Sequence, residues 1–81
     1  MKTSLVTGAN RGIGLEYCRQ LQARGDQVVA VCRDPSPELE ALGIRIEAGV
    51  ELTDSDAVDA LLLRLEGLRL DLVILNAGIL Q

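Results

Sequence analysis

Residues 7–14 have the sequence TGANRGIG, and the three glycines of this segment stand at positions 8, 12 and 14. An apolar stretch that starts near Lys2 and ends at Val6 comes directly before it. After it, apolar residues recur at spacings of three and four as far as about Arg24, which indicates a helix. The sequence therefore predicts a strand, a glycine-rich turn and a helix, and this order decides the fold.

Each glycine of the turn has a physical use. The first allows the chain to turn tightly, and the other two let the backbone approach a pyrophosphate and let the helix lie close to the strand. The helix N-terminus adds backbone N–H donors and a favourable dipole. This pattern predicts a phosphate-binding turn, and the alternative is an ordinary glycine-rich connection without a ligand.

The helix after the turn is expected to place one apolar face on a sheet. Ile13, Tyr17 and Leu21 recur along it, and Leu15 and Cys18 lie on the adjoining track. A stripe of this kind is typical of a helix that covers a sheet.

Further strands are expected at residues 28–32, near 45–48 and at 72–75. The first and last of these are continuously apolar, which favours strands buried on both faces, as in a parallel sheet. Ser36 is a candidate N-cap with Pro37 at the first helical position, so a short helix is expected as far as about Leu42.

Residues 53–56 (TDSD) offer caps for a third helix, which Gly67 would end. This helix is expected to turn four apolar side chains toward the core: Val58, Leu61, Leu62 and Leu65. Strands that alternate with helices predict an α/β fold, here a partial Rossmann-like parallel sheet of four strands in the order 3-2-1-4 with three helices. Ligands of such sheets bind at the switch point, here between the first and fourth strands.

Length, composition and charge limit the classes of function that the chain can have. The 81 residues fit one domain, and 48% of them are hydrophobic. A net charge of −4 without a basic cluster argues against a nucleic-acid partner. The apolar runs are too short to cross a membrane and no signal peptide is evident, so a cytoplasmic protein is expected. Cys18 and Cys32 lack metal-type spacing, which favours buried reduced thiols over a zinc site or a disulfide.

The glycine turn TGANRGIG, followed much later by Asn76-Ala77-Gly78, resembles the short-chain dehydrogenase/reductase family. Within that family the sequence looks most like the carbonyl-reductase-like and C-factor-like members. The resemblance extends along all 81 residues but covers only the N-terminal part of a typical member. It implies that residues 1–81 are the dinucleotide-binding part of a Rossmann domain, truncated before the catalytic segment.

The resemblance also implies a set of cofactor-binding residues. In the turn these are Thr7, Gly8, Asn10, Arg11, Gly12, Ile13 and Gly14. Glu51 and Leu52 stand where the family commonly has an aspartate and an apolar residue that hold the adenine, and a solvated acid near a helix start is the alternative for Glu51. Asn76, Ala77 and Gly78 would brace the sheet and line the ribose, while Leu75 replaces an asparagine found in many relatives.

The cofactor is expected to be NADP(H) rather than NAD(H). Family members that prefer NAD usually place an acid at the end of the second strand, and Cys32 stands in that position. Arg33 follows it, and its guanidinium could pair with a 2′-phosphate, as could Arg11 from the other side. The alternative is that both arginines are solvated surface charges and that Asp34 neutralises Arg33.

Catalysis in the family uses a serine, a tyrosine with a lysine four residues later, and a further asparagine. The only tyrosine here, Tyr17, has Leu21 four residues later, and the sequence contains no histidine. The chain alone is therefore expected to be inactive, although its full-length relatives transfer hydride between NADP(H) and a carbonyl or alcohol.

Two functional hypotheses follow. The first is the dinucleotide-binding portion of an NADP(H)-dependent oxidoreductase. The second is a non-catalytic nucleotide-binding or partner-binding module, complete at 81 residues. Without the residues that flank it in the family, the apolar fourth strand would form an open sheet edge, which predicts self-association, strand pairing between copies or instability.

Overall fold

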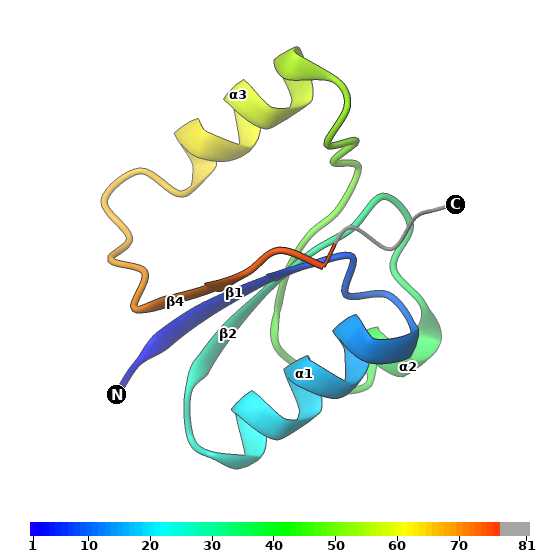
Figure 1. Cartoon of the computed structure of the whole chain (residues 1–81), viewed down its shortest axis with the longest axis vertical. Coiled ribbons are helices and arrows are strands. Elements are labelled where there is room, and N and C mark those ends of the chain that lie inside the picture. The colour runs from blue at the N-terminus through cyan, green and yellow to red at the C-terminus, as the bar shows by residue number, and fades with distance from the viewer. Residues whose placement is uncertain (77–81) are drawn as a thin grey trace.

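The chain forms seven helices and strands in the order that the sequence predicts, as the computed structural model shows for residues 1–76 (Figure 1). They are β1 (Thr3–Thr7), α1 (Gly12–Ala23), β2 (Gln27–Val31), α2 (Pro37–Glu40), β3 (Arg45–Glu47), α3 (Ser55–Arg64) and β4 (Leu72–Ile74). The strands form one sheet in the order β3-β2-β1-β4, and each pair is parallel. The predicted fold class and strand order are confirmed.

The register aligns the carboxyl ends of the strands at one edge. β1 pairs with β2 from Thr3 opposite Gln27 to Thr7 opposite Val31. On its other side β1 pairs with β4, where Val6 lies opposite Ile74. Thr7, assigned to the turn from the sequence, is therefore the last residue of β1, and the turn begins at Gly8.

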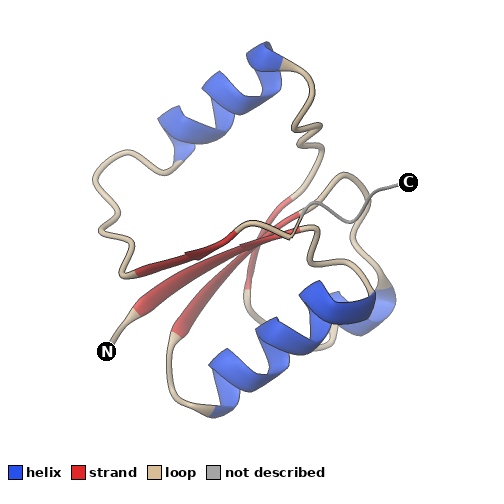
Figure 2. Ribbon diagram, viewed as in Figure 1, coloured by secondary structure: helices blue, strands red, loops and turns tan. Residues whose placement is uncertain are grey.

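Helices cover both faces of the sheet. Figure 2 shows α1 and α2 on one face and α3 on the other. Side chains that alternate along the strands supply the two apolar layers. The layer under α1 and α2 contains Val6, Ala9, Leu15, Cys18, Leu21, Val28, Ala30, Cys32 and Leu39. The layer under α3 contains Leu5, Val29, Val31, Val50, Leu61 and Leu65.

The prediction that Ile13 and Tyr17 belong to the buried face of α1 was wrong. Ile13 is 68% exposed and Tyr17 is 41% exposed. The helix instead packs through the row that contains Gly14, Cys18 and Leu21. A glycine lets the helix backbone approach the strand most closely, so the row that includes Gly14 faces the sheet and the neighbouring row points outward.

The prediction that Leu62 of α3 faces the core was also wrong, because this residue is 60% exposed. Leu61 and Leu65 are buried, and Val58 is half-buried. These three residues are spaced by three and four and form one narrow stripe, beside which Leu62 lies one position further round the helix.

The predicted cap Ser36 is present, and of the candidates at residues 53–56 the N-cap of α3 is Asp54. The Ser36 hydroxyl accepts from the Leu39 N–H at 3.2 Å, and the Asp54 carboxylate accepts from the Asp56 and Ala57 N–H groups. The boundaries differ by a residue or two: α2 ends at Glu40 rather than near 42, β3 ends at 47, and β4 ends at 74, before the exposed Leu75.

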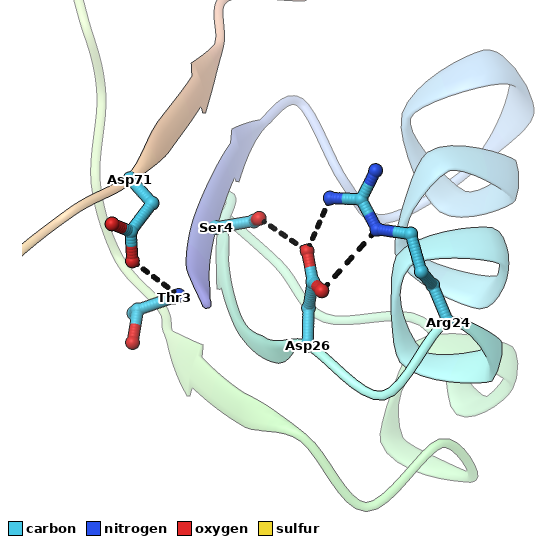
Figure 3. A network of polar contacts seen from close by, with 5 residues as sticks. All are labelled: Thr3, Ser4, Arg24, Asp26 and Asp71. Carbon is cyan, nitrogen blue, oxygen red and sulfur yellow. Dashed lines mark hydrogen bonds and ion pairs between the residues drawn. The ribbon is translucent and has the colours of Figure 1, made fainter. Parts of the chain in front are cut away.

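A polar network ties the amino edge of the sheet together (Figure 3). The buried Ser4 hydroxyl donates to the Asp26 carboxylate at 2.9 Å, and the Arg24 guanidinium pairs with the same carboxylate at 2.5 Å. The Thr3 N–H donates to Asp71 at 2.9 Å. The hydrogen bond from Arg24 is the main cause that lowers the pKa of Asp26. Desolvation raises this pKa, but the hydrogen bond from Ser4 and the positive charges of Arg24 and Lys2 lower it further. This network fixes the end of α1 to the start of β1.

Candidate functional site

The turn between β1 and α1 uses its three glycines in two different ways. Gly8 and Gly12 both have φ of +61°, in the left-handed region that favours glycine. A Cβ on Gly8 would overlap the Asn76 carbonyl oxygen, and a Cβ on Gly14 would overlap the Gly8 carbonyl oxygen and crowd the Asn76 amide. A Cβ on Gly12 would meet nothing within 4 Å. Gly8 and Gly14 therefore serve close packing, whereas Gly12 keeps one side of the backbone open.

Thr7 and Asn76 join the ends of β1 and β4. The Asn76 N–H donates to the Thr7 hydroxyl oxygen at 2.9 Å, and that hydroxyl donates to the Asn76 carbonyl at 3.4 Å. The Asn76 side-chain amide donates to the Gly8 carbonyl at 3.4 Å. Thr7 is buried, so the structure assigns it this positioning role at the base of the turn.

The N-terminus of α1 differs from those of the other helices. Its N-cap residue, Arg11, makes no side-chain cap, and no acid lies in the first turn. In α2 and α3 the caps are Ser36 and Asp54, and acids follow in the first turn. The first N–H groups of a helix need acceptors from outside it. In α1 the side chains of the described residues supply no cap for these donors, which is the arrangement that suits an anion.

A groove of about 730 Å³ opens at this edge of the sheet. It is lined by the glycine turn and by the segments that follow β2, β3 and β4. Its lining residues are Gly8, Asn10, Arg11, Gly12, Ile13, Val31, Cys32, Arg33, Asp34, Val50, Glu51, Leu52, Thr53 and Asn76. Of the residues expected to bind cofactor that the structure describes, only Thr7 and Gly14 are missing from this lining, and both support the turn from behind. Ala77 and Gly78 lie outside the described residues.

The ion pair of Arg33 in the groove differs from the alternative in which Asp34 neutralises this arginine. Arg33 pairs with Glu51, with 3.1 Å between Nη1 and Oε2, and not with its neighbour Asp34. The Asp34 backbone carbonyl instead accepts from the Asn10 side chain at 3.4 Å, which links the glycine turn to the segment after β2. Arg11 is exposed and lines the same groove.

Sequence reasoning missed several residues of the groove. Val31, Asp34, Val50 and Thr53 line it without belonging to the family motifs. Their shared signal is position, because all of them lie at or just after the carboxyl ends of β2 and β3. In an open parallel sheet this is the edge where ligands bind, so a register prediction could have found them.

Cys18 and Cys32 are free and buried thiols, as expected. Burial raises the pKa of Cys18 to about 11, with a smaller contribution from Cys32. The pKa of Cys32 is also raised, first by burial and then by the negative charge of Asp34. Both thiols therefore stay protonated near neutral pH, and Cys32 contributes a neutral surface to the groove.

Among residues 1–76, no helix is long and apolar enough to span a bilayer. The same residues contain no group of histidine, cysteine and acidic side chains placed to hold a metal ion.

Comparisons with known proteins agree with this geometry. Residues 2–81 match the family described as short chain dehydrogenase. The 1-hydroxy-2-glutathionyl-2-methyl-3-butene dehydrogenase of Rhodococcus sp. (strain AD45) is 43% identical over 82 residues, which cover 99% of this chain and 36% of the relative. The chain thus spans little more than a third of that curated relative.

Solved structures give the same result. A carbonyl reductase from Pseudomonas aeruginosa PAO1 matches with a TM-score of 0.88 and 36% identity, over 98% of this chain and 39% of its own. A short-chain dehydrogenase from Sphingobium yanoikuyae, solved in complex with NADPH, matches with a TM-score of 0.79 and 36% identity, over 100% of this chain and 35% of its own. The glycine turn, the sheet order and these matches together show that the chain belongs to the short-chain dehydrogenase family.

Proposed function

We propose that the groove at the carboxyl edge of the sheet binds NADP(H), with the pyrophosphate over the glycine turn and the adenosine 2′-phosphate at Arg33. The observation that carries this proposal is the combination at the start of α1. Its N-terminus has no side-chain cap, and Gly12 leaves the backbone open on the groove side. A dinucleotide fits this arrangement because its pyrophosphate is an anion that accepts backbone N–H groups.

The preference for the phosphorylated cofactor rests on charge. Cys32 is neutral where an acid would repel a 2′-phosphate, and Arg33 beside it lines the groove. Arg11 lines the groove from the turn, so two guanidinium groups can approach one phosphate. The Sphingobium neighbour solved with NADPH supports the same choice.

The adenosine would lie beyond the ends of β3 and β4. Leu52 is exposed in the groove and offers an apolar surface to the adenine, and Glu51 offers a carboxylate for its amine. Asn76 would line the ribose, together with Ala77 and Gly78 as the family resemblance implies.

The whole protein is proposed to transfer hydride between NADP(H) and a carbonyl or alcohol substrate. The names of the relatives, a dehydrogenase and a carbonyl reductase, support this class. A bound nicotinamide would supply the hydride, and the residues described here would bind and orient the nucleotide. Tyr17 lies exposed on α1 with the buried Leu21 four residues later, so it is no candidate for the proton donor, and the chain alone stays predicted to be inactive. The alternative of a non-catalytic module is not favoured, because the relatives are oxidoreductases.

The test is a calorimetric titration of the chain with NADPH and NADH at one ionic strength. Arg33→Ala should weaken NADPH binding by about 10- to 100-fold, the effect of losing a charge-assisted hydrogen bond, and leave NADH binding nearly unchanged. Arg69→Ala is the matched control, because Arg69 is an exposed arginine that does not line the groove. Equal losses in the two variants, or no binding of either nucleotide by the unaltered chain, would contradict the proposal.

Self-association stays a prediction. Leu72 and Val73 of β4 are partly exposed along the sheet edge. Sedimentation velocity over a range of chain concentrations would test it, since a stable monomer at high concentration would contradict pairing through β4. The cytoplasmic location is likewise still a prediction.

A further inference from the structure

The ion pair between Arg33 and Glu51 lies in the groove where the 2′-phosphate is proposed to bind. Both residues line the groove, and Nη1 of Arg33 donates to Oε2 of Glu51 at 3.1 Å. The side chains are 71% and 43% exposed. The guanidinium proposed to recognise the phosphate therefore already has an acidic partner.

Backbone hydrogen bonds bring the segments that carry Arg33 and Glu51 together. Beyond the last paired residues of β2 and β3, the Gly49 N–H donates to the Arg33 carbonyl at 2.9 Å. The Val50 N–H donates to the Cys32 carbonyl at 3.1 Å. These two bonds hold the segments side by side, so the side chains at 33 and 51 emerge next to each other.

An exposed pair of this kind is weak, and a phosphate can replace it. Measured exposed ion pairs are worth about 0.2 to 1 kcal/mol, whereas a phosphate monoester carries about −1.5 to −2 charges at pH 7 and binds arginine in bidentate fashion. Glu51 nevertheless opposes that exchange in two ways. It occupies a donor of Arg33, and its negative charge remains beside the incoming phosphate.

We propose that Glu51 is a specificity-determining residue that restrains Arg33 and lowers the preference of this site for 2′-phosphorylated nucleotides. This inference rests on the proposed function of the groove. It gives Glu51 a role opposite in sign to the adenine contact suggested by the family resemblance: loss of an adenine contact weakens every adenine nucleotide, whereas release of Arg33 strengthens only those with a 2′-phosphate.

The test uses two small probes, 2′,5′-ADP and 5′-AMP, which differ at the 2′-phosphate. Glu51→Gln keeps the size of the side chain and removes its charge. We expect it to tighten binding of 2′,5′-ADP relative to 5′-AMP by about two- to fivefold, the range of exposed ion pairs, because the glutamine amide oxygen can still accept from the adenine amine. Circular dichroism and the thermal midpoint confirm that the variant is folded.

Two further variants isolate the pair. Asp34→Asn removes one negative charge from the same groove without breaking the ion pair, so its gain should be clearly smaller. In an Arg33→Ala background, Glu51→Gln should give a clearly smaller gain, because no guanidinium is left to release and only the direct repulsion of the phosphate is removed. Equal gains from Asp34→Asn and Glu51→Gln, a gain that Arg33→Ala leaves undiminished, weaker binding of both probes, or no change would each overturn this inference.

Failure of the two proposals would look different. If the unaltered chain binds 2′,5′-ADP more tightly than 5′-AMP in an Arg33-dependent way and Glu51→Gln has no effect, only the role of Glu51 is wrong. If the unaltered chain binds neither probe nor NADPH, the proposed function of the groove fails as well.

Discussion

The two edges of the sheet treat their polar groups in opposite ways. At the amino edge, Ser4 and Arg24 both donate to the Asp26 carboxylate, and Asp71 accepts from the Thr3 N–H. At the carboxyl edge, the start of α1 has no side-chain cap, and the turn leaves a groove beside it.

This difference separates stability from binding. Polar groups that are satisfied within the chain stabilise the fold and have little left to offer a ligand. Donors that the described side chains leave without a cap can instead be satisfied by an anion. The glycines of the turn span both roles, because Gly8 and Gly14 pack against Asn76 while Gly12 faces open space. Substitutions at the two edges should therefore have distinct effects.

The largest effect is expected from Gly14→Ala. The added Cβ would overlap the Gly8 carbonyl oxygen, which is backbone and cannot rotate away. Forcing α1 off the sheet should lower the free energy of unfolding by about 3 kcal/mol, at the upper end of overpacking costs. Urea denaturation followed by circular dichroism measures this loss. A loss below that of Gly12→Ala would show that close packing is not the reason for glycine at position 14.

Gly12→Ala should affect stability less and binding more. Its Cβ meets no neighbouring atom, so the cost comes only from the left-handed backbone, about 1 to 2 kcal/mol. The methyl group would, however, stand on the open side of the turn where the pyrophosphate is proposed to lie. Calorimetry below the thermal midpoint should show a clear loss of NADPH and NADH affinity alike. Unchanged affinity in a folded variant would place the pyrophosphate elsewhere.

The arrangement of helices and strands that forms these two edges was predictable from the sequence. The glycine spacing, the apolar strands, and the caps at Ser36 and within residues 53–56 act locally, so they predicted the order of elements. The rules for crossovers between parallel strands then predicted the strand order 3-2-1-4. The choice of Gly14 over Ile13 as the inward row was harder, because hydrophobicity alone favours the isoleucine. The glycine decides it through close approach of the helix to the strand.

Side-chain partners were the part that the sequence could not supply. Asp26 meets Ser4 across 22 positions, and Arg33 meets Glu51 across 18. Both pairings depend on which strand ends lie side by side, and therefore on register. The sequence offered the adjacent Asp34 as the partner of Arg33, whereas the bonds between the segments after β2 and β3 bring Glu51 there instead.

The smallest of these effects is expected at the amino edge, from Asp26→Asn. The amide keeps an oxygen that can accept from Ser4 and loses only the charge that pairs with Arg24. The thermal midpoint at neutral pH should fall modestly, and the affinity for NADPH should not change, because Asp26 lies at the edge opposite the groove. Asp59→Asn, at an exposed acid on α3, is the control and should do neither.

The pH dependence of that difference tests the charge itself. The folded chain lowers the pKa of Asp26 below its ordinary value of 3.8, mainly through the hydrogen bond from Arg24. A lowered pKa gives stability that is fully present above the unfolded-state value and is lost as the pH falls through the folded-state value. The gap in unfolding free energy between the unaltered chain and Asp26→Asn should therefore be constant from neutral pH to about pH 5 and shrink below about pH 4. A gap as large at pH 3 as at neutral pH would mean that Asp26 stabilises this edge through hydrogen-bond geometry alone, and that its ion pair with Arg24 contributes nothing.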